Sequence, residues 1–407
     1  MWLWYDCAFF VAFGVRRGRG YKFYKRIDKQ EERAIIALVS SITRPPYHKG
    51  VTLMASVSVP GLPSWDNRSV PAVSLIVLCR NEQPYIAVCI QSLCAQDLPA
   101  GSFEIIVADG LSTDGTREIL ARLVAAHACL HIIDNPGRIA STGFNTAVRA
   151  AQGKIIVRID VHTRYAPDYV RQCLAVLHET GADNVGGPWV AQGMGYIGRA
   201  VAAAFQSPFA VGGARGHNPH YTGPVDTVYL GCWRREVFER IGFFDEELAR
   251  NEDDEFNLRL QRAGGLIWQS PRIRSWYHAR ASLRALWRQY MQYGYWKVRV
   301  IQKHRMPASV RHLVPAAFVA TMLTLPLLAL LWPGVWGLWG GLGLLYIVEI
   351  LAVSVATAWR GGGTLWPVLP VVFACYHLGY GYGFLRGLWD LCLWRRPPAK
   401  AMLALTR

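Results

Sequence analysis

The chain has 407 residues, and its 44 Lys and Arg side chains exceed its 28 Asp and Glu side chains by 16 at neutral pH. Hydrophobic residues make up 52% of the sequence and charged residues 18%, a balance that excludes a disordered chain and disfavours an ordinary soluble protein. The positive charge indicates an anionic partner, but no helix-turn-helix, zinc-finger or RNA-binding motif accompanies it, so we do not expect nucleic acid. The nine Cys are scattered singly, as reduced thiols of a cytosolic domain would be.

Residues 1–70 form a basic N-terminal extension, with the apolar run MWLWYDCAFFVAFGV followed by RRGRGYKFYKR. The apolar run is shorter than the ~20 residues that span a bilayer, and it lacks the basic region and cleavage site of a signal peptide. Two interpretations remain open. Either translation starts at Met54 and residues 1–53 are a misassigned start, or the extension is an interfacial anchor.

Residues 71–280 alternate short apolar runs with helical segments. Three largely continuous apolar runs end in polar residues: Val73–Arg80, Phe103–Asp109 and Lys154–Asp160. Such runs are typical of parallel strands that helices cover on both faces, so the pattern predicts a doubly wound α/β sheet. Ligands of such sheets bind beyond the carboxyl ends of the strands, where Asn81, Asp109 and Asp160 fall.

Residues 281–311 carry seven Lys or Arg and no acid. Apolar residues recur in this segment at helical spacing: Leu283, Leu286, Tyr290 and Tyr293. The pattern predicts a basic amphipathic helix that lies on an anionic cytoplasmic leaflet, with membrane lipids as its partner. The alternative is a solvated basic helix that packs on the α/β domain.

Residues 312–386 are expected to be the transmembrane region, followed by a basic tail at 387–407. Between Leu313 and Ala358 the only charged residue is Glu349, and the break at 332–334 leaves two segments that are each long enough to cross a membrane. A third apolar run, Trp366–Phe384, either spans the membrane, re-enters it or lies flat.

The basic segments on both sides of this region favour the cytoplasm, which requires an even number of crossings. We therefore expect two firm spans and a third membrane segment. The predicted location is a bacterial-type inner (cell) membrane, multi-pass, with the α/β domain of residues 71–280 in the cytoplasm.

Five motifs within 71–293 resemble, in order, those of family 2 glycosyltransferases with the GT-A fold. They are PAVSLIVLCRNE from Pro71, IVADGLSTDGT from Ile106, NPGRIASTGFNTAVRAAQG from Asn135, LGCWRREVFERIGFFDEEL from Leu230 and NEDDEFNLRL from Asn251. Within the family, the chain resembles membrane-attached exopolysaccharide glucosyltransferases of the succinoglycan type. The resemblance implies a GT-A nucleotide-sugar-binding domain with a Rossmann-like mixed sheet, an interfacial helix and C-terminal transmembrane helices.

The resemblance also implies the roles of individual residues. The UDP-sugar pocket is assigned to Cys79, Arg80, Asn81, Glu82, Asp109, Gly137 and Asp160. The acceptor side is assigned to Gly231, Cys232, Trp233 and Gln289. At its strand end, the Asp109 carboxylate can accept a hydrogen bond from uracil N3–H or a ribose hydroxyl, and the alternative is a role in capping the turn.

The D-x-D metal motif of the family reads Asp160-Val161-His162 here. Imidazole is a competent ligand for Mn²⁺, whereas Mg²⁺ prefers oxygen, so His162 in place of a carboxylate weakens the site or shifts its preference. His278 resembles the distal histidine of the metal site, and a purely structural histidine is the alternative. The expected cofactor is Mg²⁺ or Mn²⁺, which neutralises the leaving diphosphate.

Four consecutive acids, Glu252 to Glu255, mark an expected helix start. The alternative to a functional role is that they form a solvated run of surface charges. The resemblance makes Asp253 the catalytic base, with Glu252 and Asp254 beside it. Repulsion by these like charges would raise the pKa of Asp253 and suit it to deprotonate the acceptor hydroxyl. In-line displacement by such a base inverts configuration, so an α-linked donor gives a β-glycoside.

Processive members of the family carry Q-x-x-R-W on the interfacial helix, where this chain has Gln289-Tyr290-Met291-Gln292-Tyr293. The missing Arg, for which Lys297 or Arg299 could substitute, argues against a long-chain synthase. We expect transfer of one sugar, glucose from UDP-glucose, to a lipid-linked oligosaccharide in exopolysaccharide biosynthesis, alongside other polysaccharide-assembly proteins.

Two other functions stay open: a polyprenyl-phosphate glycosyltransferase, and a non-catalytic membrane scaffold that kept the GT-A fold. The Gly-rich stretch 186–230 is expected to be a mobile acceptor loop.

Overall fold

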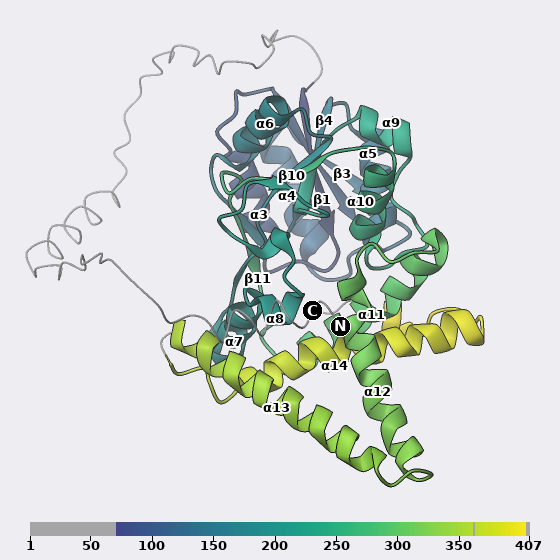
Figure 1. The fold of residues 1–407 in the computed structure, drawn as a ribbon. Coiled ribbons are helices and arrows are strands. Elements are labelled where there is room, and N and C mark those ends of the chain that lie inside the picture. Colours follow the sequence, from purple (N-terminus) through teal and green to yellow (C-terminus); the bar gives the residue numbers. More distant parts are fainter. Residues whose placement is uncertain (1–70, 361–362, 404–407) are drawn as a thin grey trace, which may run out of the picture. The chain divides into compact units, whose positions relative to one another are not determined.

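A computed structural model describes residues 71–360 and 363–403, which belong to one compact unit (Figure 1). The interpretations of residues 1–70, and the last four residues of the basic tail, lie outside the described residues.

An eight-stranded mixed sheet forms the centre of the fold, in the order β3-β2-β1-β4-β9-β6-β10-β8. Its strands are β1 (Val73–Cys79), β2 (Phe103–Asp109), β3 (Leu130–Asp134), β4 (Ile155–Asp160), β6 (Asn184–Gly187), β8 (Gly223–Pro224), β9 (Tyr229–Arg234) and β10 (Ile267–Gln269). The three apolar runs form β2, β1 and β4, which pair in parallel as predicted. Strand β9 runs antiparallel to β4 and β6, which makes the sheet mixed.

Helices cover both faces of this sheet. One face packs on α3 (Ile86–Cys94), α4 (Thr116–Ala126) and α6 (Tyr169–Thr180). The other packs on α5 (Ala140–Ala150), α9 (Glu236–Ile241) and α10 (Glu252–Arg262). The largely apolar strands are therefore buried on both sides, which is the doubly wound arrangement that the sequence predicted.

A second, three-stranded sheet joins distant segments of the chain. Strand β11 (Ser275–His278) pairs with β5 (Thr163–Tyr165) and with β7 (Val190–Gln192). Because β5 begins directly after His162 and Tyr277 lies opposite Thr163, the pairing brings His278 to the end of β4.

The Gly-rich stretch 186–230 is not one mobile loop, and that expectation is wrong. It forms β6 and β7, the helices α7 (Gly195–Phe205) and α8 (Pro208–Val211), the 3₁₀ turn Arg215–His217, and β8. Buried apolar residues of α7, among them Val201 and Phe205, pack with C-terminal helices and fix its position.

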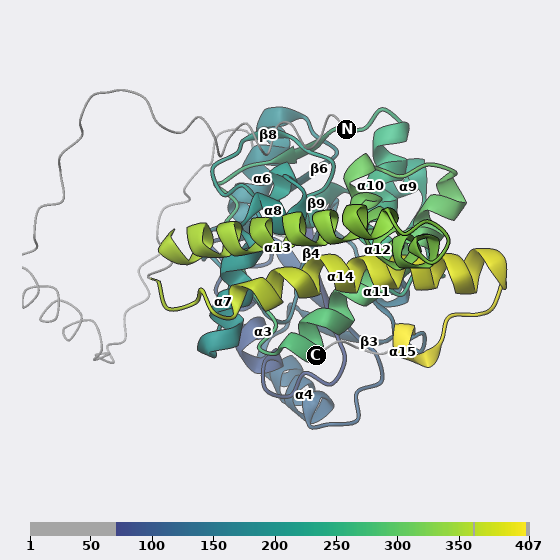
Figure 2. The ribbon, with the colours of Figure 1, turned by 60° about the horizontal axis from the view of Figure 1, so that its bottom comes forward.

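The C-terminal part consists of helices. They are α11 (Leu283–His304), the 3₁₀ turn η2 (Val310–His312), α12 (Val314–Ala329), α13 (Val335–Arg360), α14 (Leu369–Gly387), the π-helical segment η3 (Leu388–Leu393) and α15 (Lys400–Leu403). Two helical segments, Val310–Ala329 and Val335–Arg360, are long and apolar enough to span a membrane. Only 17% of the most apolar window of each is buried, unlike the core helix of a soluble protein. In Figure 2, α13 and α14 run next to each other across the view.

Helices α11 and α14 pack closely through glycines. A Cβ atom added to Gly383 of α14 would come within 1.9 Å of the Met291 carbonyl oxygen, and one added to Gly294 of α11 within 2.0 Å of the Tyr380 carbonyl oxygen. Such contacts are possible only where the facing residue is small. Leu286 and Tyr290 of α11 pack in the same cluster as α7 and α14. The expectation that this face lies on lipid is therefore wrong, and the structure favours the alternative of a helix packed on protein.

Candidate active site

Asp109 ends β2 and is fully buried. Its carboxylate accepts hydrogen bonds from the Ser112 backbone N–H at 3.1 Å and from the Ser112 hydroxyl at 2.5 Å. The guanidinium of Arg117 lies 3.5 Å from it. Asp109 thus holds the turn after β2, which is the capping alternative.

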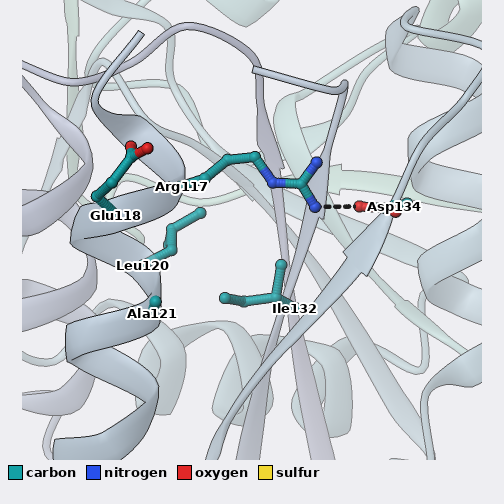
Figure 3. A pocket seen from close by; sticks show the side chains of 6 residues that line it. All are labelled: Arg117, Glu118, Leu120, Ala121, Ile132 and Asp134. Carbon is teal, nitrogen blue, oxygen red and sulfur yellow. Dashed lines mark hydrogen bonds and ion pairs between the residues drawn. The ribbon is translucent and has the colours of Figure 1, made fainter. Parts of the chain in front are cut away.

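Arg117 reaches from α4 across to Asp134, with 2.5 Å between nitrogen and oxygen (Figure 3). A cavity of about 620 Å³ lies beside it, lined by Arg117, Glu118, Leu120, Ala121, Ile132 and Asp134. Arg117 therefore stands between this cavity and the Asp109 carboxylate. Neither the catalytic acids nor the metal motif line the cavity.

The loop after β1 is tied to the turn after β2. Asn81 has a left-handed backbone (φ 55°), its amide oxygen accepts from the Thr113 N–H at 2.8 Å, and its own N–H donates to Ser112. Arg80 packs on Gly110 and donates to the Arg138 carbonyl at 3.3 Å, next to Gly137. These predicted pocket residues therefore lie together beyond the carboxyl ends of the strands.

Cys79 and Gly137 serve the fold. The side chain of Cys79 is only 5% exposed and lies in the core cluster, so the prediction that it lines the pocket is wrong for the side chain. Gly137 follows β3, and a Cβ there would lie 2.4 Å from the Thr142 hydroxyl oxygen, so the position requires glycine.

The metal motif forms a chain of contacts with Glu82. His162 Nε2 lies 2.7 Å from a carboxylate oxygen of the buried Glu82, and His162 Nδ1 lies 3.4 Å from Asp160. The ring of Tyr85 packs against His162 at 4.8 Å between centroids. Burial by itself raises the pKa of Asp160, but hydrogen bonding to His162 and the charges of His162 and Arg158 hold it below the ordinary value.

His278 interacts electrostatically with this motif. Burial and the charges of His162 and Arg164 lower its pKa, and Asp160 opposes them. A carboxylate with two imidazoles suits Mn²⁺ in chemistry, and the Asp160 side chain is 40% exposed. Over residues 71–360 and 363–403, however, no three His, Cys, Asp or Glu side chains converge as a metal site. His162 would have to leave Glu82 to bind a cation through Nε2.

The four acids begin α10, as predicted, and three of them have cationic partners. Glu252 pairs with Arg158 at 2.9 Å and Asp254 with Lys297 at 2.5 Å. Glu255 lies 2.8 Å from Arg259 and 2.9 Å from His304. Asp253 forms no ion pair with any Lys, Arg or His in the described part of the chain, and its carboxylate accepts only the Asp254 N–H, at 2.8 Å.

The environment of Asp253 suits a base. Burial, together with the charges of Glu252 and Asp254, raises its pKa to about 6, and Arg158 opposes this rise. The like-charge effect expected from the sequence is thus present, although burial is the larger cause. The first turn of a helix favours anions, so the acidic cluster is also compatible with the local backbone.

Helix α11 holds the start of α10. Asn251, with a left-handed backbone (φ 62°), donates from its side-chain amide to the Tyr293 carbonyl at 3.0 Å. Lys297 is nearly buried where it meets Asp254. Both flanks of Asp253 are therefore fixed by α11.

Neither cation proposed to replace the missing arginine is available for that role. Lys297 pairs with Asp254, and Arg299 pairs with Glu247 at 3.0 Å. A guanidinium nevertheless stands beside position 292, because Arg250 Nε donates to the side-chain oxygen of Gln292 at 3.2 Å. Sequence reasoning missed Arg250 because it lies on another segment of the chain.

The acceptor residues predicted on β9 lie in the core. Cys232 is fully buried and Trp233 is 1% exposed, packed among the rings of Phe144, Phe238 and Phe256, so the prediction that they contact the acceptor is wrong. Gly231, at φ 109°, leaves room for the Trp233 ring. Gln289 donates to the hydroxyls of Tyr277 at 3.2 Å and Tyr293 at 3.0 Å, so this residue belongs to a polar cluster.

Arg158 is a second residue that the sequence interpretation did not use. It lies on β4 two positions before Asp160, and its guanidinium joins that strand to Glu252. The signal was a charged residue inside an otherwise apolar strand, because a buried charge requires a partner.

Comparisons with known proteins agree with this arrangement. Residues 74–242 match the model of "Glycosyl transferase family 2". The chain is 34% identical over 329 residues to the succinoglycan biosynthesis protein ExoA of Rhizobium meliloti, covering 78% of this chain and 95% of that protein. It is 24% identical over 326 residues to a dolichyl N-acetyl-α-D-glucosaminyl phosphate 3-β-D-2,3-diacetamido-2,3-dideoxy-β-D-glucuronosyltransferase of Methanococcus voltae, covering 78% of this chain and 97% of that protein.

A solved structure resembles the fold: the mannosyltransferase PcManGT from Pyrobaculum calidifontis, in complex with GDP-Man and Mn²⁺. The TM-score is 0.52 at 19% identity, and the match covers 82% of this chain and 91% of that one. This likeness confirms the GT-A architecture. Together with the ordered motifs, the sheet that carries them and the relative matched over nearly its full length, it leads to one assignment: the chain belongs to glycosyl transferase family 2 and is a nucleotide-sugar-dependent glycosyltransferase.

Proposed function

We propose that this enzyme moves one sugar, glucose from UDP-glucose, to a hydroxyl of a lipid-linked oligosaccharide with inversion, forming a β-linkage in exopolysaccharide assembly. One observation carries the proposal: among four clustered acids, Asp253 alone lacks a cationic partner in the described chain, and its pKa is about 6. A general base works best when its pKa is close to the operating pH.

Asp253 takes the proton of the acceptor hydroxyl as the oxygen attacks the anomeric carbon. The bond from that carbon to the diphosphate breaks on the opposite side, and the nucleotide diphosphate leaves. Glu252 and Asp254, anchored by Arg158 and Lys297, position the base and do not share its role.

A divalent cation, Mg²⁺ or Mn²⁺, held by Asp160, His162 and His278, would supply charge neutralisation at the leaving diphosphate. The Mn²⁺ in the PcManGT complex supports this assignment. The Asp160 side chain, which is 40% exposed and lies beside His162, supports it as well.

The names of the relatives support the substrate class. One relative serves succinoglycan biosynthesis, and the other is named for a dolichyl phosphate that already carries a sugar. A saccharide on a lipid phosphate is therefore a better acceptor candidate than the bare polyprenyl phosphate. The two apolar helices and the basic segments beside them support a multi-pass cell-membrane enzyme with a cytoplasmic catalytic domain. Anionic lipids and other polysaccharide-assembly proteins are its proposed partners.

Membranes that contain the full chain, radiolabelled nucleotide sugars and short lipid-linked acceptors, with Mn²⁺ or a chelator, test the proposal. We expect Asp253→Asn to lower transfer by about 10²–10⁴-fold with donor binding retained, because that is the usual contribution of a general base. Asp97→Asn, which removes an exposed acid outside the site, is the matched control.

Substantial transfer by the Asp253→Asn variant would refute the role of the base. Chloroform-soluble product from bare polyprenyl phosphate would establish the alternative acceptor. No transfer from any donor by the unaltered chain would favour the scaffold.

A further inference from the structure

Two belts of tryptophan mark the ends of α13. Trp336 and Trp339 lie in its first two turns and are 46% and 37% exposed, and Trp359 lies at its end and is 85% exposed. From Trp339 to Trp359 the helix rises about 30 Å, the thickness of the hydrocarbon core of a bilayer. Tryptophan concentrates at both interfaces of a membrane, so the spacing of these belts indicates where the two membrane interfaces lie along α13.

The belt at the end of α13 continues onto the catalytic domain. Trp366, in the connection to α14, is 54% exposed. The hydroxyl of Tyr196, in the first turn of α7, donates to the Thr364 carbonyl in that connection at 3.1 Å. The first turn of α7 therefore lies beside the end of α13, as Figure 1 also shows.

The rest of α7 fixes this position. Val201 and Phe205 pack in one cluster with Ala358 of α13 and Phe373 of α14. The Val201 carbonyl accepts from the Tyr376 hydroxyl at 3.1 Å. Because α7 packs on both α13 and α14, its exposed first turn is held at the same depth relative to the membrane as Trp359 and Trp366.

The exposed side chains suit a phospholipid headgroup layer. Met194 is 74% exposed and Tyr196 is 41% exposed, at the N-terminal end of α7. Arg199 on α7 and Arg360 at the end of α13 are exposed cations. Residues 186–225 contain no acid, so nothing on this segment repels anionic lipid.

We propose that the first turn of α7, Met194–Tyr196, is a membrane-contact element of the catalytic domain that inserts among phospholipid headgroups beside the end of α13. The inference rests on the membrane insertion of α13 proposed above, but not on the identity of the sugar or acceptor. It gives the catalytic domain a contact with the bilayer of its own, in addition to the two apolar helices.

Depth-dependent quenching tests it in the full chain. Dansylalanine is placed by stop-codon suppression at position 194, at Leu345 in the middle of α13, or at Val124 on α4. Each protein is reconstituted in nanodiscs of three parts phosphatidylcholine to one part phosphatidylglycerol. A nitroxide is carried on the lipid headgroup or at acyl carbon 12.

We expect the label at 194 to be quenched at least twofold more by the headgroup nitroxide than by the acyl one. The label at 345 should show the reverse order, and the label at 124 should respond to neither. Equal insensitivity at 194 and 124, with quenching at 345, would overturn the inference while the membrane insertion of α13 stands. No acyl quenching at 345 would overturn both.

Discussion

Replacing the proposed base should make the protein more stable. Burial and the charges of Glu252 and Asp254 raise the pKa of Asp253 from 3.8 to about 6. At about 1.4 kcal/mol per pH unit, keeping this carboxyl ionised costs the folded state about 3 kcal/mol at most. Asn has a similar shape without the charge, so Asp253→Asn should recover most of this energy while transfer is lost.

The stability gained by Asp253→Asn should depend on pH. An acid whose folded pKa is raised carries no penalty below pH 3.8, because it is protonated in both states. The penalty grows between pH 3.8 and about 6 and stays constant above. The gain in thermal midpoint of Asp253→Asn should therefore be full at pH 8 and should vanish near pH 4.

Thermal unfolding of the detergent-solubilised chain, followed by tryptophan fluorescence across this pH range, provides the assay. Asp97→Asn, at a side chain that is 63% exposed, should change stability by less than about 1 kcal/mol at any pH. If Asp253→Asn is no more stable than the unaltered chain at pH 8, or if its gain does not depend on pH, the ionised Asp253 carboxyl does not destabilise the folded state.

Three further predictions concern the same region. The activity of the unaltered chain should fall tenfold per pH unit below about pH 6, because Asp253 becomes protonated. Glu252→Gln should shift this fall in activity to lower pH, because the substitution removes a charge that raises the pKa of Asp253. An unshifted pH profile would contradict an electrostatic interaction between Glu252 and Asp253. Lys297→Met should destabilise the chain by about 1–3 kcal/mol in thermal unfolding, because Asp254 loses its nearest cation but is 32% exposed, and added Asp254→Asn should restore much of the loss. Gly383→Ala should lower the thermal midpoint clearly, whereas Gly343→Ala, with open space around it, should not; equal effects would contradict the close packing of α11 on α14.

The sequence predicted the parts of the fold that depend on local pattern. The apolar runs that became β1, β2 and β4 were recognisable because both their faces are buried, and the acid cluster was recognisable because its motif is contiguous. The ion pairs of Arg158 and Lys297 could not be predicted. Each joins residues 43 or more positions apart, so only the folded chain brings the partners together.

The errors on β9 and α11 have a common physical cause. An apolar or aromatic residue next to a family motif can line a ligand site or fill the core, and the local sequence is the same in both cases. Trp233 filled the core because β9 is paired on both edges and three Phe rings surround it. The apolar face of α11 met α14 because α14 carries glycines at the contact, which its own hydropathy does not reveal.

The expected boundary at residue 280 separates parts that work together. Among the described residues, Asp253 itself forms no hydrogen bond or ion pair with α11, yet Asn251 and Asp254 on either side of it are held there by Tyr293 and Lys297. Helix α11 is held in turn by α14, whose glycines allow the backbones of the two helices to approach closely. The position of the base is thus set from the side of the protein that carries the two apolar helices. An acceptor that reaches Asp253 from a membrane would meet a base whose placement depends on α11 and α14, and α14 packs in turn on the two apolar helices α12 and α13.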